Sequence, residues 1–242
     1  MKNLATISLI LACLALTISA ACTSYLHTDG NAIGTIDPIT GTYTIIMPSI
    51  YFRDIAVSAD DRIFGTDGVN LYFVDQAAKI STLLGNIEAS EQIIGLGFAT
   101  DGNLYASGNS FGFYVLDQAN GKGTLLASLP EGVDDLAFNP LTEEFFTASH
   151  LGGNLYAIKL DGTYRYIGPT GYIFWGMMYY NNVLYAYSRD MQYIVDQNTG
   201  IALFDKDLGG KVPYGAASPP CFGRCPLPAT QRGCLCSLKR RR

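Results

Sequence analysis

Five short segments recur along the chain at nearly equal intervals, and this periodicity restricts the possible folds more than any other feature. The segments read DIAVS, GLGFA, DLAFN, GMMYY and GAASP, and successive ones begin 41, 40, 41 and 39 residues apart. A period of about 40–45 residues built from short strands is typical of β-propellers. The five segments begin at Asp54, Gly95, Asp135, Gly176 and Gly215.

The rest of each repeat predicts a blade of four antiparallel strands. A second segment such as NLYAS, a third such as FYVLD and a fourth such as GTLLASL follow, with turns rich in Gly, Asn and Asp between them. Near the N-terminus only the last three strands occur, SYLHT, AIGTID and TYTIIM. We expect residues 213–218 to supply the missing first strand by pairing with residues 24–28, which leaves no free edge. The sequence therefore predicts an all-β, five-bladed β-propeller closed by a C-terminal strand; a truncated six- or seven-bladed relative is the alternative.

Composition divides the chain into three regions. Residues 1–21 have the basic start, apolar run and small-residue end of a signal peptide, with a buried helix or a membrane anchor as alternatives. Residues 22–220 form the predicted propeller and contain nine basic and all 21 acidic residues, so their formal charge is −12. An acidic body argues against nucleic acid as a partner. Residues 221–242 form a Cys-rich tail with six basic residues and no acidic one, which we expect to be irregular and solvated.

The repeat units DGNLYAS and VDQNTGIA resemble those of secreted bacterial NHL/YVTN-type β-propeller proteins. The likeness covers residues 24–218 and implies the fold, but no particular activity, because such units encode blades. Enzymes with related blades, such as the gluconolactonase family, bind a divalent metal through Glu, Asn and Asp in the channel. That set does not map here, because the inner segments begin Asp, Gly, Asp, Gly, Gly. We expect no metal and no other cofactor.

Catalytic motifs such as HExxH and the P-loop are missing from the sequence. His27 and His150 have no partner motif nearby, which favours packing or surface roles. Asp-Gly turns at Asp29, Asp67 and Asp101 lack the dense oxygen ligands of a calcium site and are interpreted as ordinary turns.

The loops before the inner segments are expected to surround the central channel, where propeller ligands usually bind. Aromatic rings beside carboxylates suit a carbohydrate or a small polar molecule, through stacking and hydrogen bonding. Alternatively, Phe174 and Trp175 only fill the channel, and the channel carboxylates bind strand-end amides. The candidate ligand-binding residues are Arg53, Asp54, Asp134, Asp135, His150, Tyr172, Trp175, Arg189 and Tyr214.

We therefore expect an exported, periplasmic or extracellular binding or interaction module that is monomeric and has no catalytic residue. Its partner would be a small molecule, a glycan or a protein. The rival function is a hydrolase of glycosides or lactones that uses Asp54 and Asp135 as acid and base. That mechanism requires two carboxyl groups at a defined separation with opposite protonation.

The cysteines allow two arrangements near the start of the propeller. Cys22 follows the predicted cleavage site and is either lipidated, which would attach the domain to a membrane, or joined to Cys221. Closure of the ring places the two cysteines near each other and makes a disulfide feasible. The spacing of Cys221, Cys225, Cys234 and Cys236 matches no zinc motif, so a small disulfide cap and an irregular tail both remain open.

Overall fold

A computed structural model describes residues 22–28 and 30–221. The predicted signal peptide, Asp29 and the tail beyond Cys221 lie outside the described residues. Across the part that is described, no helix has the length and apolar character needed to span a membrane.

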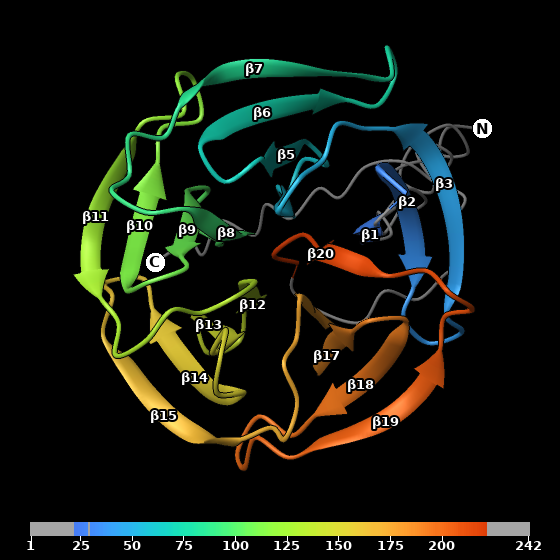
Figure 1. Cartoon of the computed structure of the whole chain (residues 1–242), viewed down its shortest axis with the longest axis vertical. Helices are drawn as coiled ribbons and strands as arrows, with labels where there is room; N and C mark the ends of the chain where they lie inside the picture. Colours follow the sequence, from blue (N-terminus) through green and yellow to red (C-terminus); the bar gives the residue numbers. More distant parts are fainter. Residues whose placement is uncertain (1–21, 29, 222–242) are drawn as a thin grey trace, which may run out of the picture.

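The described residues form five antiparallel sheets of four strands, arranged as blades around a central channel (Figure 1). This is the predicted five-bladed β-propeller. The inner strands are β4 (Asp54–Val57), β8 (Ile93–Phe98), β12 (Ala137–Asn139), β16 (Gly176–Tyr180) and β20 (Pro213–Ala217). The second strands are β5 (Ile63–Thr66), β9 (Leu104–Gly108), β13 (Glu144–Ala148), β17 (Val183–Ser188) and β1 (Ser24–Thr28). The third strands are β6 (Asn70–Asp75), β10 (Gly112–Leu116), β14 (Asn154–Lys159), β18 (Met191–Val195) and β2 (Ala32–Asp37), and the outer strands are β7 (Ile80–Asn86), β11 (Gly123–Ser128), β15 (Tyr164–Pro169), β19 (Ala202–Asp207) and β3 (Thr42–Pro48).

The last blade is closed by its most distant strand in the sequence. β20 pairs antiparallel with β1, with Tyr25 opposite Ala217 and His27 opposite Gly215. The remaining strands of this blade, β2 and β3, follow β1 directly. The predicted pairing of the C-terminal strand with residues 24–28 is therefore confirmed.

Burial follows the position of each strand in its blade. Inner and second strands such as β4 and β9 are buried along their whole length, whereas the outer strand β7 is mostly exposed. Neighbouring blades pack through aromatic rings, as where Phe113 lies 6.1 Å from Phe145 across the interface between two sheets. Burial of apolar side chains on both faces of each sheet holds the ring of blades together.

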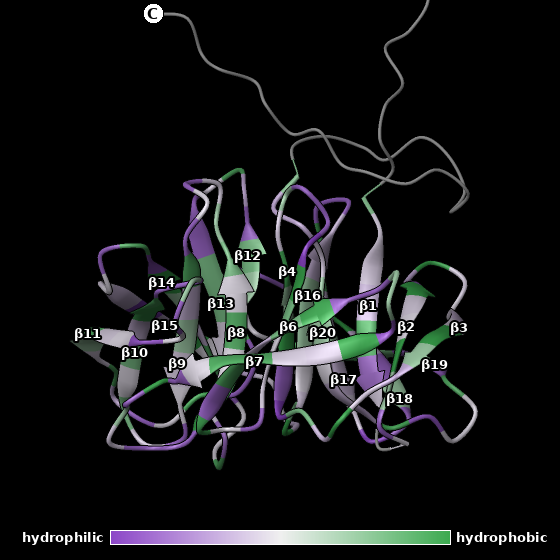
Figure 2. Cartoon of the chain, turned by 90° about the horizontal axis from the view of Figure 1, so that it is seen from above, coloured by the Kyte–Doolittle hydropathy of each residue, from purple (hydrophilic) through white to green (hydrophobic). Residues whose placement is uncertain are grey.

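The disc has two different faces. All inner strands run in the same direction, and we call the face where they begin the mouth and the face where they end the exit. Figure 2 shows the disc from the side, with one face at the top and the other at the bottom. Because β1 and β20 are antiparallel, the start of β1 at Ser24 and the end of β20 at Ala217 both lie on the exit side. The candidate ligand residues belong to the opposite face.

The two cysteines that flank the closing pair of strands are not joined to each other. Cys22 precedes β1 and Cys221 follows β20, as the predicted closure requires, but the structure forms no bond between them. The disulfide between Cys22 and Cys221 therefore remains a prediction. Peptide mapping without reduction tests it directly.

Candidate functional site at the channel mouth

Two fully buried carboxyl groups, Asp54 and Asp135, close the channel just inside the mouth. Asp54 accepts hydrogen bonds from the N–H groups of Ile55 (2.7 Å) and Leu96 (2.6 Å). Asp135 accepts three, from Leu136 at 2.6 Å, Met177 at 2.7 Å and Ala216 at 3.0 Å. The five donors come one each from the five inner segments, at the residue that follows Asp54, Gly95, Asp135, Gly176 or Gly215. We call these five N–H groups the amide ring and the two side chains the carboxyl pair.

Burial dominates the electrostatics of the carboxyl pair. It raises the pKa of both side chains, and the neighbouring Asp135 raises the pKa of Asp54 further. Hydrogen bonds from the amide ring oppose these shifts, because they favour the charged form. Two carboxylates in contact repel each other, so the pair retains a proton at a pH where exposed Asp side chains are ionised.

Asp54 and Asp135 are therefore ligands of the chain itself. Both have an exposed fraction of 0%, so neither presents an oxygen at the mouth. Of the two roles considered for them from the sequence, binding to strand-end amides is the one seen in the structure. An acid–base pair that attacks a glycoside needs access to the scissile bond, which this burial does not provide.

The first residues of the five inner segments occupy equivalent positions in the repeat, and the residues immediately before them form the mouth. The five equivalent positions are Asp54, Gly95, Asp135, Gly176 and Gly215. The mouth residues are Arg53, Ile94, Asp134, Trp175 and Tyr214. Arg53 is exposed, Trp175 and Tyr214 are half-buried, and Ile94 and Asp134 are buried. Four of the five are predicted candidates, and the repeat brings them to one rim from four different blades.

Three of the mouth aromatics form a continuous row. Trp175 stacks on Tyr214 with ring centroids 5.5 Å apart and an interplanar angle of 16°. Tyr214 in turn meets the edge of Tyr51 at 5.8 Å, and the guanidinium of Arg53 lies 5.7 Å from the centre of the Tyr51 ring. We call Trp175, Tyr214 and Tyr51 the aromatic row. Sequence reasoning missed Tyr51, although its place three residues before Asp54 in the same loop could have suggested it.

A second pair of ionisable side chains, Asp134 and His150, lies at the mouth. Nδ1 of His150, in the turn after β13, lies 2.7 Å from Oδ1 of Asp134. The His150 side chain is 44% exposed and that of Asp134 only 7%. The hydrogen bond to Asp134 raises the pKa of His150, whereas nearby Arg53 opposes protonation. Burial raises the pKa of Asp134, against the effect of His150.

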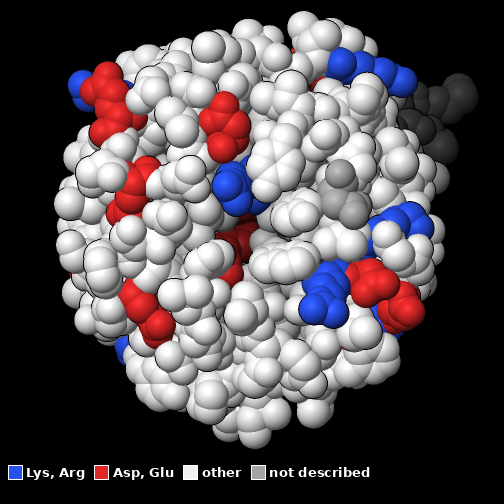
Figure 3. Space-filling model, viewed as in Figure 1, with Lys and Arg blue, Asp and Glu red and all other residues white. Residues whose placement is uncertain are grey.

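The surface view agrees with this arrangement. Figure 3 shows the mouth face with acidic atoms deep in a central hollow and a basic side chain at its rim. Uncharged residues cover most of the rest of this face around the hollow. The mouth thus combines ring surfaces with a few charged groups, as small-molecule sites commonly do.

Two predicted candidates lie outside this cluster. Tyr172 packs on Tyr193 at 4.4 Å and on the buried Phe174 at 6.1 Å. Arg189 occupies the turn between β17 and β18 with a φ of 53°. Among the described contacts, none joins either residue to the aromatic row or to the pair formed by Asp134 and His150.

His27 has the packing role expected for it. It is fully buried under the aromatic row, 5.6 Å from Phe52 and 6.4 Å from Tyr51. Burial lowers its pKa to about 4, so the ring is neutral at physiological pH. His27 thus supports Tyr51 from below.

The described residues contain no cluster of three or more His, Cys, Asp or Glu side chains that could hold a metal ion. The carboxylate of Asp101 is used within its turn, where it accepts from Asn103 and from the hydroxyl of Tyr105. Asp67 is bonded in the same way to Asn70 and Tyr72. These two turns are ordinary structural turns.

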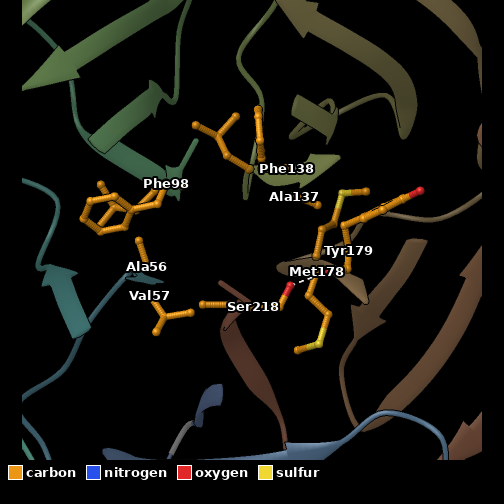
Figure 4. Close-up of a pocket in the computed structure, with 13 residues that line it drawn as sticks. Ala56, Val57, Phe98, Ala137, Phe138, Met178, Tyr179 and Ser218 are labelled. Carbon is orange, nitrogen blue, oxygen red and sulfur yellow. Dashed lines mark hydrogen bonds between the residues drawn. The ribbon is translucent and has the colours of Figure 1, made fainter. Parts of the chain in front are cut away.

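At the exit the channel contains a small pocket that is lined mainly by apolar residues and opens to solvent. Figure 4 shows Val57, Phe98, Phe138, Tyr179 and Ser218 around it. The hydroxyl of Ser218 donates to the carbonyl of Tyr179 at 2.5 Å. None of the residues that line this pocket is charged, in contrast to the mouth.

These observations define the protein as a five-bladed β-propeller. No protein-family model matches its sequence, and no match was found among curated proteins. Among solved structures it is similar to a Bacteroides thetaiotaomicron protein of unknown function, at 15% identity and a TM-score of 0.59 over 82% of this chain and 65% of the other. A chain of a nidogen/laminin complex matches at 14% identity and a TM-score of 0.58, over 84% of this chain and 87% of the other.

A gluconolactonase from Xanthomonas campestris also matches, at 16% identity and a TM-score of 0.57, over 80% of this chain and 78% of that one. At these identities the comparisons establish the propeller fold alone. The fold therefore does not identify the function, and the residues of the mouth are the basis for a functional proposal.

Proposed function

We propose that this protein is an exported binding module of the NHL/YVTN type, and that a carbohydrate or another small polar molecule binds at the channel mouth. Export rests on the character of residues 1–21, and binding rests on the mouth residues. We propose further that the domain acts as a monomer, without nucleic acid, and associates with a membrane only if Cys22 is lipidated.

The proposal rests on one observation, that the aromatic row and the pair formed by Asp134 and His150 belong to the same mouth. A sugar ring presents C–H groups that stack on an aromatic face, and hydroxyl groups that bond to charged side chains. Trp175 and Tyr214 offer the ring surface. His150 and Arg53 offer exposed polar groups at the same rim.

A glycan array tests this function. We expect the wild-type protein to bind a restricted set of glycans and Trp175→Ala to lose most of that binding. Tyr166→Ala is the matched control, because Tyr166 is a 56% exposed aromatic residue on the outer strand β15. Equal loss in both variants, or no glycan bound by the wild type, would contradict carbohydrate binding at the mouth.

A second candidate function is hydrolysis at the same mouth, and the contact between Asp134 and His150 favours it. A carboxylate on Nδ1 orients an imidazole so that Nε2 can accept a proton from water as a general base. Among the described residues, Nε2 of His150 forms no hydrogen bond to the protein. In this candidate His150, rather than Asp54 or Asp135, is the catalytic base.

A panel of lactones and glycosides separates the two functions. Turnover that falls at least about 100-fold in His150→Gln supports hydrolysis, because general bases contribute about that factor or more. No turnover by the wild type, together with specific glycan binding, supports the binding module alone. Mass spectrometry of the N-terminal peptide decides whether Cys22 carries a lipid.

A further inference from the structure

The inner strands have one free edge each, and these five edges face the channel. β4, for example, pairs with β5 on one side only, and β8, β12, β16 and β20 are likewise the terminal strands of their sheets. Backbone N–H groups on such an edge have no strand partner and need another acceptor when they are buried. The five N–H groups of the amide ring are of this kind.

The carboxyl pair satisfies all five donors with four oxygen atoms. Oδ2 of Asp135 accepts from both Met177 and Ala216, and each of the other three oxygens accepts from one donor. The hydrogen bonds of Asp54 connect β4 to β8, and those of Asp135 connect its own segment to β16 and β20. Two side chains therefore link all five blades at the axis.

Gly215, at one of the equivalent positions, leaves room for the pair. A Cβ atom on Gly215 would overlap Oδ1 of Asp54. The same Cβ atom would lie only 2.8 Å from the Cα atom of Asp54. A side chain at this position would thus displace the carboxyl group. The absence of a side chain at Gly215 is therefore explained by the carboxyl group of Asp54.

Positive side chains do not neutralise this pair. The described ion pairs include neither Asp54 nor Asp135. The neighbouring Asp134 directs its carboxylate to His150 and not to the ring. Backbone N–H groups are consequently the main partners of the negative charge, as in oxyanion holes and anion-binding nests.

We propose that the amide ring is a carboxylate-binding site, that Asp54 and Asp135 are its built-in ligands, and that free acetate occupies it when both side chains are removed. Acetate has the same heavy atoms as the part of an Asp side chain that is lost on substitution by Gly. A substitution to Gly also matches the residue present at the other three positions. This inference is independent of the proposed function, because it concerns the ring beneath the mouth.

Thermal unfolding of Asp54→Gly/Asp135→Gly at pH 5.5, in 100 mM sodium acetate against 100 mM sodium chloride, tests the proposal. A ligand at a concentration of ten times its Kd raises the Tm of a domain of this size by about 3–6 °C. We expect such a rise in the double variant, and less than 1 °C in the wild type, whose ring is occupied. Asp134→Gly is the matched control, because it removes a buried carboxylate that is not bonded to the ring, and we expect it to respond like the wild type.

The single variant Asp54→Gly extends the test if the double variant fails to fold. It leaves the three hydrogen bonds of Asp135 in place and removes the acceptor of only two donors. We expect acetate to raise its Tm above the value in chloride. The proposal is overturned if neither variant responds to acetate more than the wild type and Asp134→Gly do.

Discussion

The carboxyl pair and the mouth residues lie only one position apart in the repeat, yet they have opposite properties. At the equivalent positions, Asp54 and Asp135 are fully buried and bonded only to the chain. One residue earlier, Arg53 is exposed, and Trp175 and Tyr214 are half-buried with ring faces at the rim. Neighbouring residues of the same segment thus serve the closed channel and the open surface.

The pair Asp134 and Asp135 shows this difference within two adjacent carboxyl groups. Asp135 accepts three backbone hydrogen bonds, whereas Asp134 has one side-chain partner, His150, and a second oxygen without a hydrogen bond. Removal of the Asp135 carboxyl group leaves buried N–H donors unsatisfied, whereas removal of the Asp134 carboxyl group does not. The repeat aligns Asp135 with Asp54, but it does not show which groups each aspartate binds.

The largest effect that we predict is a loss of stability in Asp135→Ala. Three buried N–H groups lose their acceptor, and each costs about 1–3 kcal/mol when it remains unsatisfied. We therefore expect the free energy of unfolding to fall by at least about 3 kcal/mol, and by about 1 kcal/mol or less in Asp134→Ala. Urea denaturation of both variants measures the contrast, and equal losses would show that the two aspartates do not differ.

A second prediction concerns the pH dependence of stability. Burial raises the pKa of Asp135 from its ordinary value of 3.8 to about 7, so the folded protein binds more protons than the unfolded chain between these values. The free energy of unfolding should therefore rise as the pH falls from about 7 towards 4. Carboxylates with lowered pKa values, such as Asp60 and Asp67, act in the opposite direction, and their contribution is lost below about pH 4.

The double variant Asp54→Asn/Asp135→Asn isolates this effect, because its side chains do not titrate. We expect the gain in stability of the wild type from pH 8 to pH 5 to exceed that of the double variant by on the order of 2 kcal/mol. The pairing of His150 with Asp134 also favours the folded state at lower pH and is common to both proteins. Identical pH profiles would exclude a proton held by the carboxyl pair.

The smallest effect belongs to the mouth. Asp134 is the main cause of the raised pKa of His150, so Asp134→Asn should lower that pKa. The shift is followed by proton NMR of the imidazole, with His27 as an internal reference that burial keeps neutral. An unchanged titration of His150 would mean that the contact at 2.7 Å does not persist in solution.

The sequence predicted the blades and their closure correctly because both depend on periodic strand patterns. Near-equal intervals between DIAVS and its equivalents define five blades, and the displaced strand GAASP defines the closure. The same pattern placed Arg53, Asp134, Trp175 and Tyr214 on one rim. These results follow from the repeat alone.

Other features of the mouth and channel depend on distances within and between blades, which a repeat does not encode. The contact of His150 with Asp134 joins a turn to a loop 16 residues away, and the stacking of Trp175 on Tyr214 joins two blades. Tyr172 is not part of the aromatic row, because its ring packs on Tyr193 of the same blade. The choice between ligand binding and amide binding for Asp54 and Asp135 required the positions of five backbone N–H groups.

Carbon-13 NMR titration of the Asp carboxyl carbons tests the central claim most directly, since it reports the protonation of each side chain. The account predicts that at pH 6 the carboxyl pair still carries a proton, while exposed Asp161, whose pKa is lowered, is ionised. Ionisation of both Asp54 and Asp135 below pH 5, together with the surface aspartates, would contradict a shared buried pair on the amide ring.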